Sequence, residues 1–167
     1  MGPGGDKLHD WFFEPDTISL EMATKAMSVI GAMICGRTTY DHSIRWWEAD
    51  GPTGSARVPL VVLTHQVPDN VPDNSVYHFV TGGVEHALAQ AKEAAGDRDI
   101  AIVGGADVIQ QFLNAGPIDE LGIHLVPVVF RAGTRLFDGL TLDHLNLEVR
   151  SVVDTAKVTH LRYRVIH

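Results

Sequence analysis

Three short stretches of this sequence place glycine, hydroxyl or basic residues directly after an apolar run. AIVGGADVIQ (101–110) carries two glycines between an apolar run and a helix-like pattern, CGRTTYD (35–41) follows glycine with arginine and threonine, and LTHQ (63–66) ends an apolar run with a hydroxyl and an imidazole. Backbone N–H groups at a helix start, hydroxyl groups and guanidinium groups all bind anions. Together, the three stretches favour a groove for a nucleotide.

Each stretch also has a purely structural explanation. The glycine pair fits a tight turn with left-handed backbone, the two threonines after Arg37 fit a helix N-cap, and Arg37 and His65 fit solvated surface side chains. The sequence contains neither G-x-G-x-x-G nor G-K-[ST], so neither phosphate-binding fingerprint decides the question. One such strand end means little, and the nucleotide interpretation depends on having three.

The elements that must position these residues follow from hydrophobic periodicity and from Gly and Pro punctuation. The pattern predicts helices over residues 17–29, 84–95 and from 106 onward, and strands over residues 32–35, 59–64, 76–80, 99–105, 119–130, 145–154 and 158–166. Strands alternate with helices up to residue 113 and strands alone follow. We therefore expect a mainly parallel α/β sheet with an antiparallel edge, and ligands of such sheets bind outside the carboxyl ends of the strands.

Composition limits the classes of partner. The 167 residues fit a single domain (1–167), and 13 basic against 21 acidic residues give a formal charge of −8, which disfavours nucleic acid and anionic membranes. The single cysteine, Cys35, lies in an apolar run and fits a buried, inert thiol in a reducing compartment. The N-terminus has no apolar signal region, so we expect a cytoplasmic protein.

Other reactive residue types form no motif. The nine histidines are scattered without H-E-x-x-H or C-x-x-C, so no metal site is predicted, and no G-x-S-x-G elbow is present. Aromatic residues gather at Trp11, Phe12 and Phe13 and again at Trp46 and Trp47. They fit either the walls of a site for a flat heterocycle or anchors in the core or in an oligomer interface.

Longer segments resemble a known family. GAMICGRTTYD, VPLVVLTHQVP, the segment from DIAIVGG to FDGL and the closing hairpin are similar to the dihydrofolate-reductase-like superfamily. The branch is the one related to the C-terminal reductase domain of the bifunctional deaminase/reductase of riboflavin biosynthesis. The combined signature is G-R-x-T-Y, then G-G-A-x-V, then D-E-L…P…G-x-R-L-F. The resemblance implies that superfamily's α/β three-layer fold, with a mostly parallel central sheet and a C-terminal antiparallel hairpin.

The same resemblance implies an NADPH-dependent reductase of a small heterocyclic or carbonyl substrate, similar to a pteridine or a ribityl-aminopyrimidine. It implies that the cofactor's phosphates lie near Gly36, Arg37 and Thr38. Its adenosine end, where a 2′-phosphate separates NADPH from NADH, would lie near Thr64 and His65. The residues implied to carry the pyrophosphate are Gly104, Gly105, Ala106, Asp107 and Val108.

The sequence departs from the family at its beginning. Relatives start with an interior strand and a segment of the type S-L-D-G-F-I-A, which borders nicotinamide and substrate and supplies an acidic residue, whereas this chain opens with MGPGGDKLHDWFF. Buried backbone groups left without that strand would cost of order 1–3 kcal/mol each. We therefore expect a start upstream of the one given, or another segment or chain in the gap. No catalytic residue is assigned, and a nucleotide-binding or interaction module without activity remains the alternative.

The closing hairpin also bears on assembly. LNLEVRSVVD and VTHLRYRVI place valines and a tyrosine on an exposed edge, which favours a homodimer.

Overall fold

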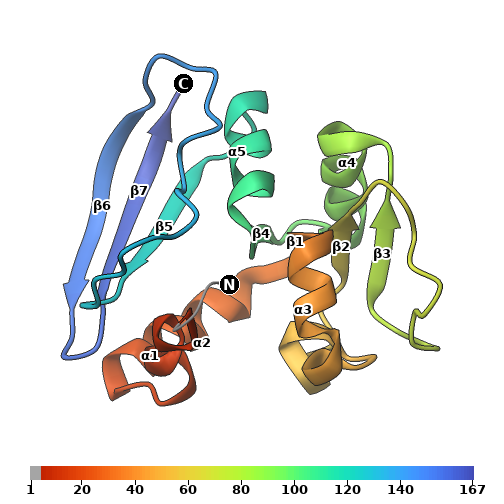
Figure 1. Ribbon diagram of the computed structural model, residues 1–167, viewed down its shortest axis with the longest axis horizontal. Helices are drawn as coiled ribbons and strands as arrows, with labels where there is room; N and C mark the ends of the chain where they lie inside the picture. The colour runs from red at the N-terminus through yellow and green to blue at the C-terminus, as the bar shows by residue number, and fades with distance from the viewer. Residues whose placement is uncertain (1–4) are drawn as a thin grey trace.

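The computed structural model describes residues 5–167, which form two β-sheets and the helices around them (Figure 1). The strands are β1 (Ile30–Gly36), β2 (Leu60–Leu63), β3 (Tyr77–Val80), β4 (Asp99–Ile102), β5 (Glu120–Leu125), β6 (Asn146–Asp154) and β7 (Thr159–Ile166). The helices are η1 (Gly5–Leu8), α1 (Asp10–Phe13), α2 (Thr17–Val29), α3 (Arg37–Trp47), η2 (Gly51–Ala56), α4 (Gly83–Ala95) and α5 (Ala106–Ala115), of which η1 and η2 are 3-10 helices.

The first sheet is parallel and has the order β3-β2-β1-β4. Every residue of β1 after Ile30 is buried. Alternate side chains of this strand point to opposite faces, so Ile34 packs with α4 and α5 while Met33 packs with Tyr40 of α3. Helices therefore cover both faces of the parallel sheet, and the parallel strands predicted from apolar runs are confirmed.

Cys35 lies in the middle of this covered sheet and is fully buried. Burial raises the pKa of its thiol to about 12. The thiol therefore stays protonated, as expected of a structural cysteine.

The C-terminal strands form a second, antiparallel sheet of order β5-β7-β6, so the predicted hairpin is confirmed. We expected these strands to extend the edge of the parallel sheet, but they form a sheet of their own. β4 is the outer strand of one sheet and β5 is the outer strand of the other, and α5 lies between the two sheets in Figure 1.

The register of the antiparallel sheet separates apolar from charged side chains. Leu121, Tyr163 and Val149 align across the three strands on one face. The next positions along, Glu120, Arg164 and Glu148, align on the other. The second sheet is therefore amphipathic in the period-two manner predicted for it.

The predicted long strand over residues 119–130 is wrong in its second half, because β5 ends at Leu125. Leu125 pairs with Thr159, which is the first residue of β7, so the partner strand ends there. Pro127 follows and has no N–H group to donate to a ladder.

Candidate functional site

The three stretches singled out in the sequence meet at one edge of the parallel sheet. Gly36 ends β1, and Thr64 and Gly104 follow the ends of β2 and β4, the two strands that pair with β1. The Gly36 N–H donates to the Gly104 carbonyl at 3.0 Å. Since parallel strands present their carboxyl ends on the same side, the fold brings the three stretches together.

Gly104 has a φ of +146°, a backbone conformation that favours glycine. A Cβ at this position would lie 3.2 Å from the Thr39 hydroxyl oxygen of α3, so a side chain would also be crowded. The two observations explain a glycine here as a close approach between the end of β4 and the start of α3.

α5 begins directly after the glycine pair. Gly105 is its N-cap residue, and no side chain caps the helix. The first turn consists of Ala106, Asp107 and Val108, so their N–H groups have no partner within the helix. The Asp107 carboxylate accepts a hydrogen bond from the Gln111 amide at 2.7 Å, while the Val108 side chain is buried. This helix start therefore offers backbone N–H groups to a ligand.

α3 begins in the same way, with Gly36 as an N-cap residue that has no side-chain cap. Thr38 and Thr39 lie inside the helix, so the alternative in which one of them is the N-cap is wrong. The Arg37 Nε donates to Asp41 Oδ1 at 2.6 Å and its Nη1 donates to the Gln66 carbonyl at 2.9 Å.

Thr64 is buried, and its hydroxyl donates to the same Gln66 carbonyl at 2.8 Å. The turn after β2 therefore holds Arg37 beside Thr64, whereas His65 is exposed to solvent. Two helix N-termini and one guanidinium converge on this edge, with Asp41 and Asp107 as the opposing negative charges nearby. Backbone N–H groups at helix starts and a guanidinium are groups that can bind an anion.

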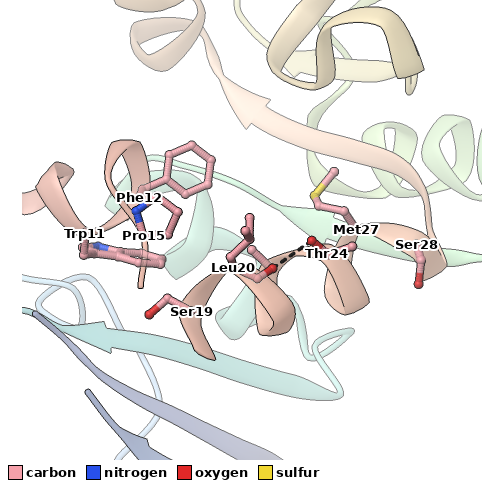
Figure 2. A pocket seen from close by; sticks show the side chains of 9 residues that line it. Trp11, Phe12, Pro15, Ser19, Leu20, Thr24, Met27 and Ser28 are labelled. Carbon is pink, nitrogen blue, oxygen red and sulfur yellow. Dashed lines mark hydrogen bonds between the residues drawn. The ribbon is translucent and has the colours of Figure 1, made fainter. Parts of the chain in front are cut away.

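A pocket of about 530 Å³ lies along α1 and α2 (Figure 2). Its lining residues are Trp11, Phe12, Pro15, Ser19, Leu20, Ala23, Thr24, Met27 and Ser28. Trp11 thus walls a pocket, as one of the sequence interpretations has it. Trp46 is 67% exposed with the Arg45 guanidinium 3.7 Å above its ring, and it does not line this pocket.

A polar cluster beside this pocket was not predicted from the sequence. Ser19 Oγ is 3.0 Å from His160 Nε2, and His160 Nδ1 is 2.8 Å from His124 Nδ1. The Trp11 ring lies against both imidazoles, 4.6 Å from His124 and 5.1 Å from His160 between centroids. The signal that could have revealed the cluster is the strand register, because His124 and His160 pair directly across β5 and β7.

The environment of the cluster favours neutral imidazoles. Desolvation lowers the pKa of His124, and a positive charge on His160 would lower it further. Burial lowers the pKa of His160, while the charge of Asp16 opposes that shift. The Ser19 backbone N–H donates to Asp16, which is the main reason that the pKa of this carboxyl is lowered.

Residues 5–167 offer neither a metal-binding cluster nor a membrane-spanning helix among the parts that the structure describes. Among the side chains that the structure describes within residues 5–167, no three or more of His, Cys, Asp or Glu are grouped so that they could hold a metal ion. None of its helices has the length and apolar character needed to cross a bilayer.

A family described as the RibD C-terminal domain matches residues 7–161. The uncharacterized protein YwjB of Bacillus subtilis is 28% identical over 134 residues, which are 80% of this chain and 73% of YwjB.

Two solved structures are similar over most of their length. A protein from Shewanella sp. PV-4 assigned to riboflavin biosynthesis has a TM-score of 0.70 at 24% identity, covering 92% of this chain and 82% of that one. Dihydrofolate reductase from Enterococcus faecalis, solved with NADP(H) and RAB-propyl, has a TM-score of 0.60 at 18% identity, covering 89% and 82%. At these identities the two structures establish the fold, which is dihydrofolate-reductase-like.

Proposed function

The chain belongs to the RibD C-terminal domain family, and from that premise we propose that it is a reductase that transfers a hydride from NADPH to a small heterocyclic or carbonyl substrate. The family and the fold support a reductase-type function. What we propose beyond this is that the cofactor is NADPH and that the substrate is a small heterocyclic or carbonyl compound.

One observation carries the proposal: two helices that begin without a side-chain cap start at neighbouring strand ends. Gly36 precedes α3 and Gly105 precedes α5, and the Gly36 N–H is bonded to the Gly104 carbonyl between them. A dinucleotide carries negative charge at several phosphates, and a pair of such helix starts supplies N–H groups for more than one of them.

The residues present fit NADPH. The uncapped starts of α3 and α5, next to Gly104 and Gly105, would take the pyrophosphate, and Arg37 would supply a positive charge. The turn at Thr64 and His65 lies beside Arg37 and would take the adenosine end with its 2′-phosphate. When bound, the cofactor supplies a hydride, and the protein's part is to hold the two rings together.

The pocket along α1 and α2 would take the substrate. Trp11, Phe12 and Leu20 give it flat and apolar walls, and its volume of about 530 Å³ suits a pteridine or pyrimidine ring. A pteridine-like or ribityl-aminopyrimidine-like compound is therefore the substrate class we propose, with simple carbonyl compounds as the wider set.

The proposal is tested by titrating the protein with NADPH and with NADH while following cofactor fluorescence. We expect Arg37→Ala to weaken the binding of NADPH more than that of NADH. The matched control is Arg150→Ala, which removes an exposed arginine from β6, and it should leave both affinities unchanged. A protein that shows no fluorescence change at millimolar NADPH would contradict the proposal.

A second candidate is a nucleotide-binding module that does not turn over substrate. The division of the sheet favours it, because β4, which leads to Gly104, is an outer strand. Cofactor binding without reduction of dihydropterins, ribityl-aminopyrimidines or simple carbonyl compounds would support this candidate. Reduction of any of them would eliminate it.

We also propose that the chain forms a homodimer through the apolar face of the antiparallel sheet. On this face Val149 is 60% exposed and Val152 is 57% exposed, although their neighbours across β7 are half-buried. An exposed apolar strand of this kind favours pairing. Light scattering should report a dimer at micromolar concentration that Val149→Asp converts to a monomer, and a monomeric native protein would contradict the proposal.

A further inference from the structure

The pocket along α1 and α2 lacks a lining side chain that exchanges protons near neutral pH. Besides apolar groups, its nine lining residues contribute three hydroxyls, from Ser19, Thr24 and Ser28. The Thr24 hydroxyl donates to the Leu20 carbonyl, and the Ser28 hydroxyl donates to the Lys25 carbonyl, each at 2.8 Å. The Ser19 hydroxyl differs, because its neighbour is an imidazole nitrogen.

From Ser19, hydrogen bonds lead away from the pocket to solvent. His160 has only 2% of its surface exposed and contacts both neighbours. Its Nε2 is bonded to Ser19 Oγ, and its Nδ1 is bonded to the Nδ1 of His124. His124 is exposed and has its Nε2 free to exchange protons with water in the described structure. An imidazole can take a proton on one nitrogen while it releases one from the other, so each link of this path can pass a proton.

We propose that His124, His160 and Ser19 form a relay that carries a proton from solvent to a ligand in the pocket. The assignment rests on the proposed reductase function, in which Ser19 touches the substrate as the catalytic proton donor and the two histidines act through it. It fills the place of the proton donor that the sequence left unassigned.

The step balances as follows. The substrate carbon receives a hydride, and the adjacent nitrogen or oxygen takes the proton of the Ser19 hydroxyl. Ser19 Oγ takes the proton from His160 Nε2, His160 Nδ1 takes one from His124 Nδ1, and His124 Nε2 takes one from water. The substrate gains two hydrogens, the cofactor is oxidised, and the hydroxide ion left by the water is neutralised by the buffer. Each protein group ends with as many protons as it had, with both imidazoles in the opposite tautomer until they exchange protons again.

The charged groups around the relay come from several elements. Asp16 lies at the start of α2, and the Lys157 ammonium bonds to Glu14 in the segment between α1 and α2. The Arg162 and Glu120 ion pair lies on the same face of the antiparallel sheet as the two histidines. Asp16 favours a proton on His160, and desolvation of both rings disfavours it. Because both pKa values are lowered from 6.5, we expect proton supply to decline as pH rises within the range below 6.5.

The first test needs neither cofactor nor substrate. NMR of the imidazole nitrogens in histidine-labelled protein should show His124 and His160 titrating as a coupled pair, and Ser19→Ala should move the His160 Nε2 signal. Ser28→Ala, which removes another hydroxyl of α2, should leave that signal in place. Independent titration of the two rings, or no response to Ser19→Ala, would overturn the relay.

The second test measures NADPH oxidation with a dihydropterin as acceptor over a range of pH. His124 is exposed and so suited to replacement, and His124→Asn should lower kcat by about 100-fold and remove its pH dependence while NADPH affinity stays unchanged. His86→Asn is the matched control, because His86 is an exposed histidine of α4 whose Nδ1 bonds to the carbonyl of the N-cap residue Gly82. Ser19→Ala should lower kcat and remove its pH dependence in the same way as His124→Asn, with NADPH affinity unchanged.

The outcomes separate this inference from the proposed function. Wild-type turnover that His124→Asn and Ser19→Ala leave intact would overturn the relay and keep the reductase. NADPH binding without turnover of a dihydropterin, a ribityl-aminopyrimidine or a simple carbonyl compound would overturn both the reductase and the catalytic relay, even if the imidazoles titrate as a pair. Failure of the wild-type protein to bind NADPH would overturn the cofactor assignment.

Discussion

The two sheets of this protein differ in how they are covered. The parallel sheet has helices on both faces, and β1 in its interior is buried along almost its whole length. In the antiparallel sheet no residue of β6 is fully buried, and a polar path through His160 joins β7 to α2. One sheet therefore fixes backbone donors at its strand ends by dense packing, and the other contributes titratable side chains beside a pocket.

The difference in coverage between the two sheets should show most strongly when a matched apolar side chain is removed from each of them. Ile34 is fully buried in β1, whereas Ile166 of β7 is 42% exposed. We expect Ile34→Ala to lower the free energy of unfolding by about 2–5 kcal/mol, and Ile166→Ala to change it by about 0.5 kcal/mol or less. Urea denaturation measures both, and equal losses would contradict the difference in packing between the sheets.

A smaller effect is expected at the strand ends of the parallel sheet. Gly104→Ala should lower the free energy of unfolding by more than about 1 kcal/mol, because alanine is strained at a positive φ, and it should also weaken NADPH binding, since the new methyl group would crowd Thr39. Gly54 also has a positive φ but has open space around it. Gly54→Ala should therefore reproduce the loss of stability and leave cofactor affinity unchanged, and a loss of affinity there would count against the strand-end site.

The smallest of the three expected effects is a loss of stability in acid, which should originate at the antiparallel sheet. The pKa values of His124 and His160 are lowered in the folded protein from 6.5, so the unfolded chain binds protons more readily than the folded one. This stabilising contribution is present above 6.5 and is lost as pH falls toward the folded values. Denaturation at a series of pH values should show the decline, and the His124→Asn, His160→Asn double variant should show less of it than His86→Asn.

The sequence was most informative about the parallel sheet, because each of its elements has a strong local signal. Apolar runs marked β1, β2 and β4, and Gly96 marked the end of α4. The length of β5 was overestimated because apolar residues continue beyond Leu125, while the end of the partner strand is a tertiary property. The separation into two sheets likewise depends on which strands pair, and periodicity does not encode pairing.

The residues of the candidate site also differ in whether a local sequence signal could reveal them. The stretches at Gly36, Thr64 and Gly104 could be found locally, since each is a strand end followed by anion-compatible groups, and parallel pairing brings them together. His124 and His160 could not, because each looks like an ordinary strand residue until the register places them opposite one another. Ser19 joins them from a helix much earlier in the chain.

The buried thiol of Cys35 has a practical consequence. A thiol held in its protonated form inside the sheet reacts poorly with maleimides and iodoacetamides, which require an accessible thiolate. A second cysteine introduced on the surface would therefore take a fluorophore or a spin label selectively, without removal of the native one. Two such positions, one on β3 and one on β6, would allow the distance between the sheets to be followed in solution.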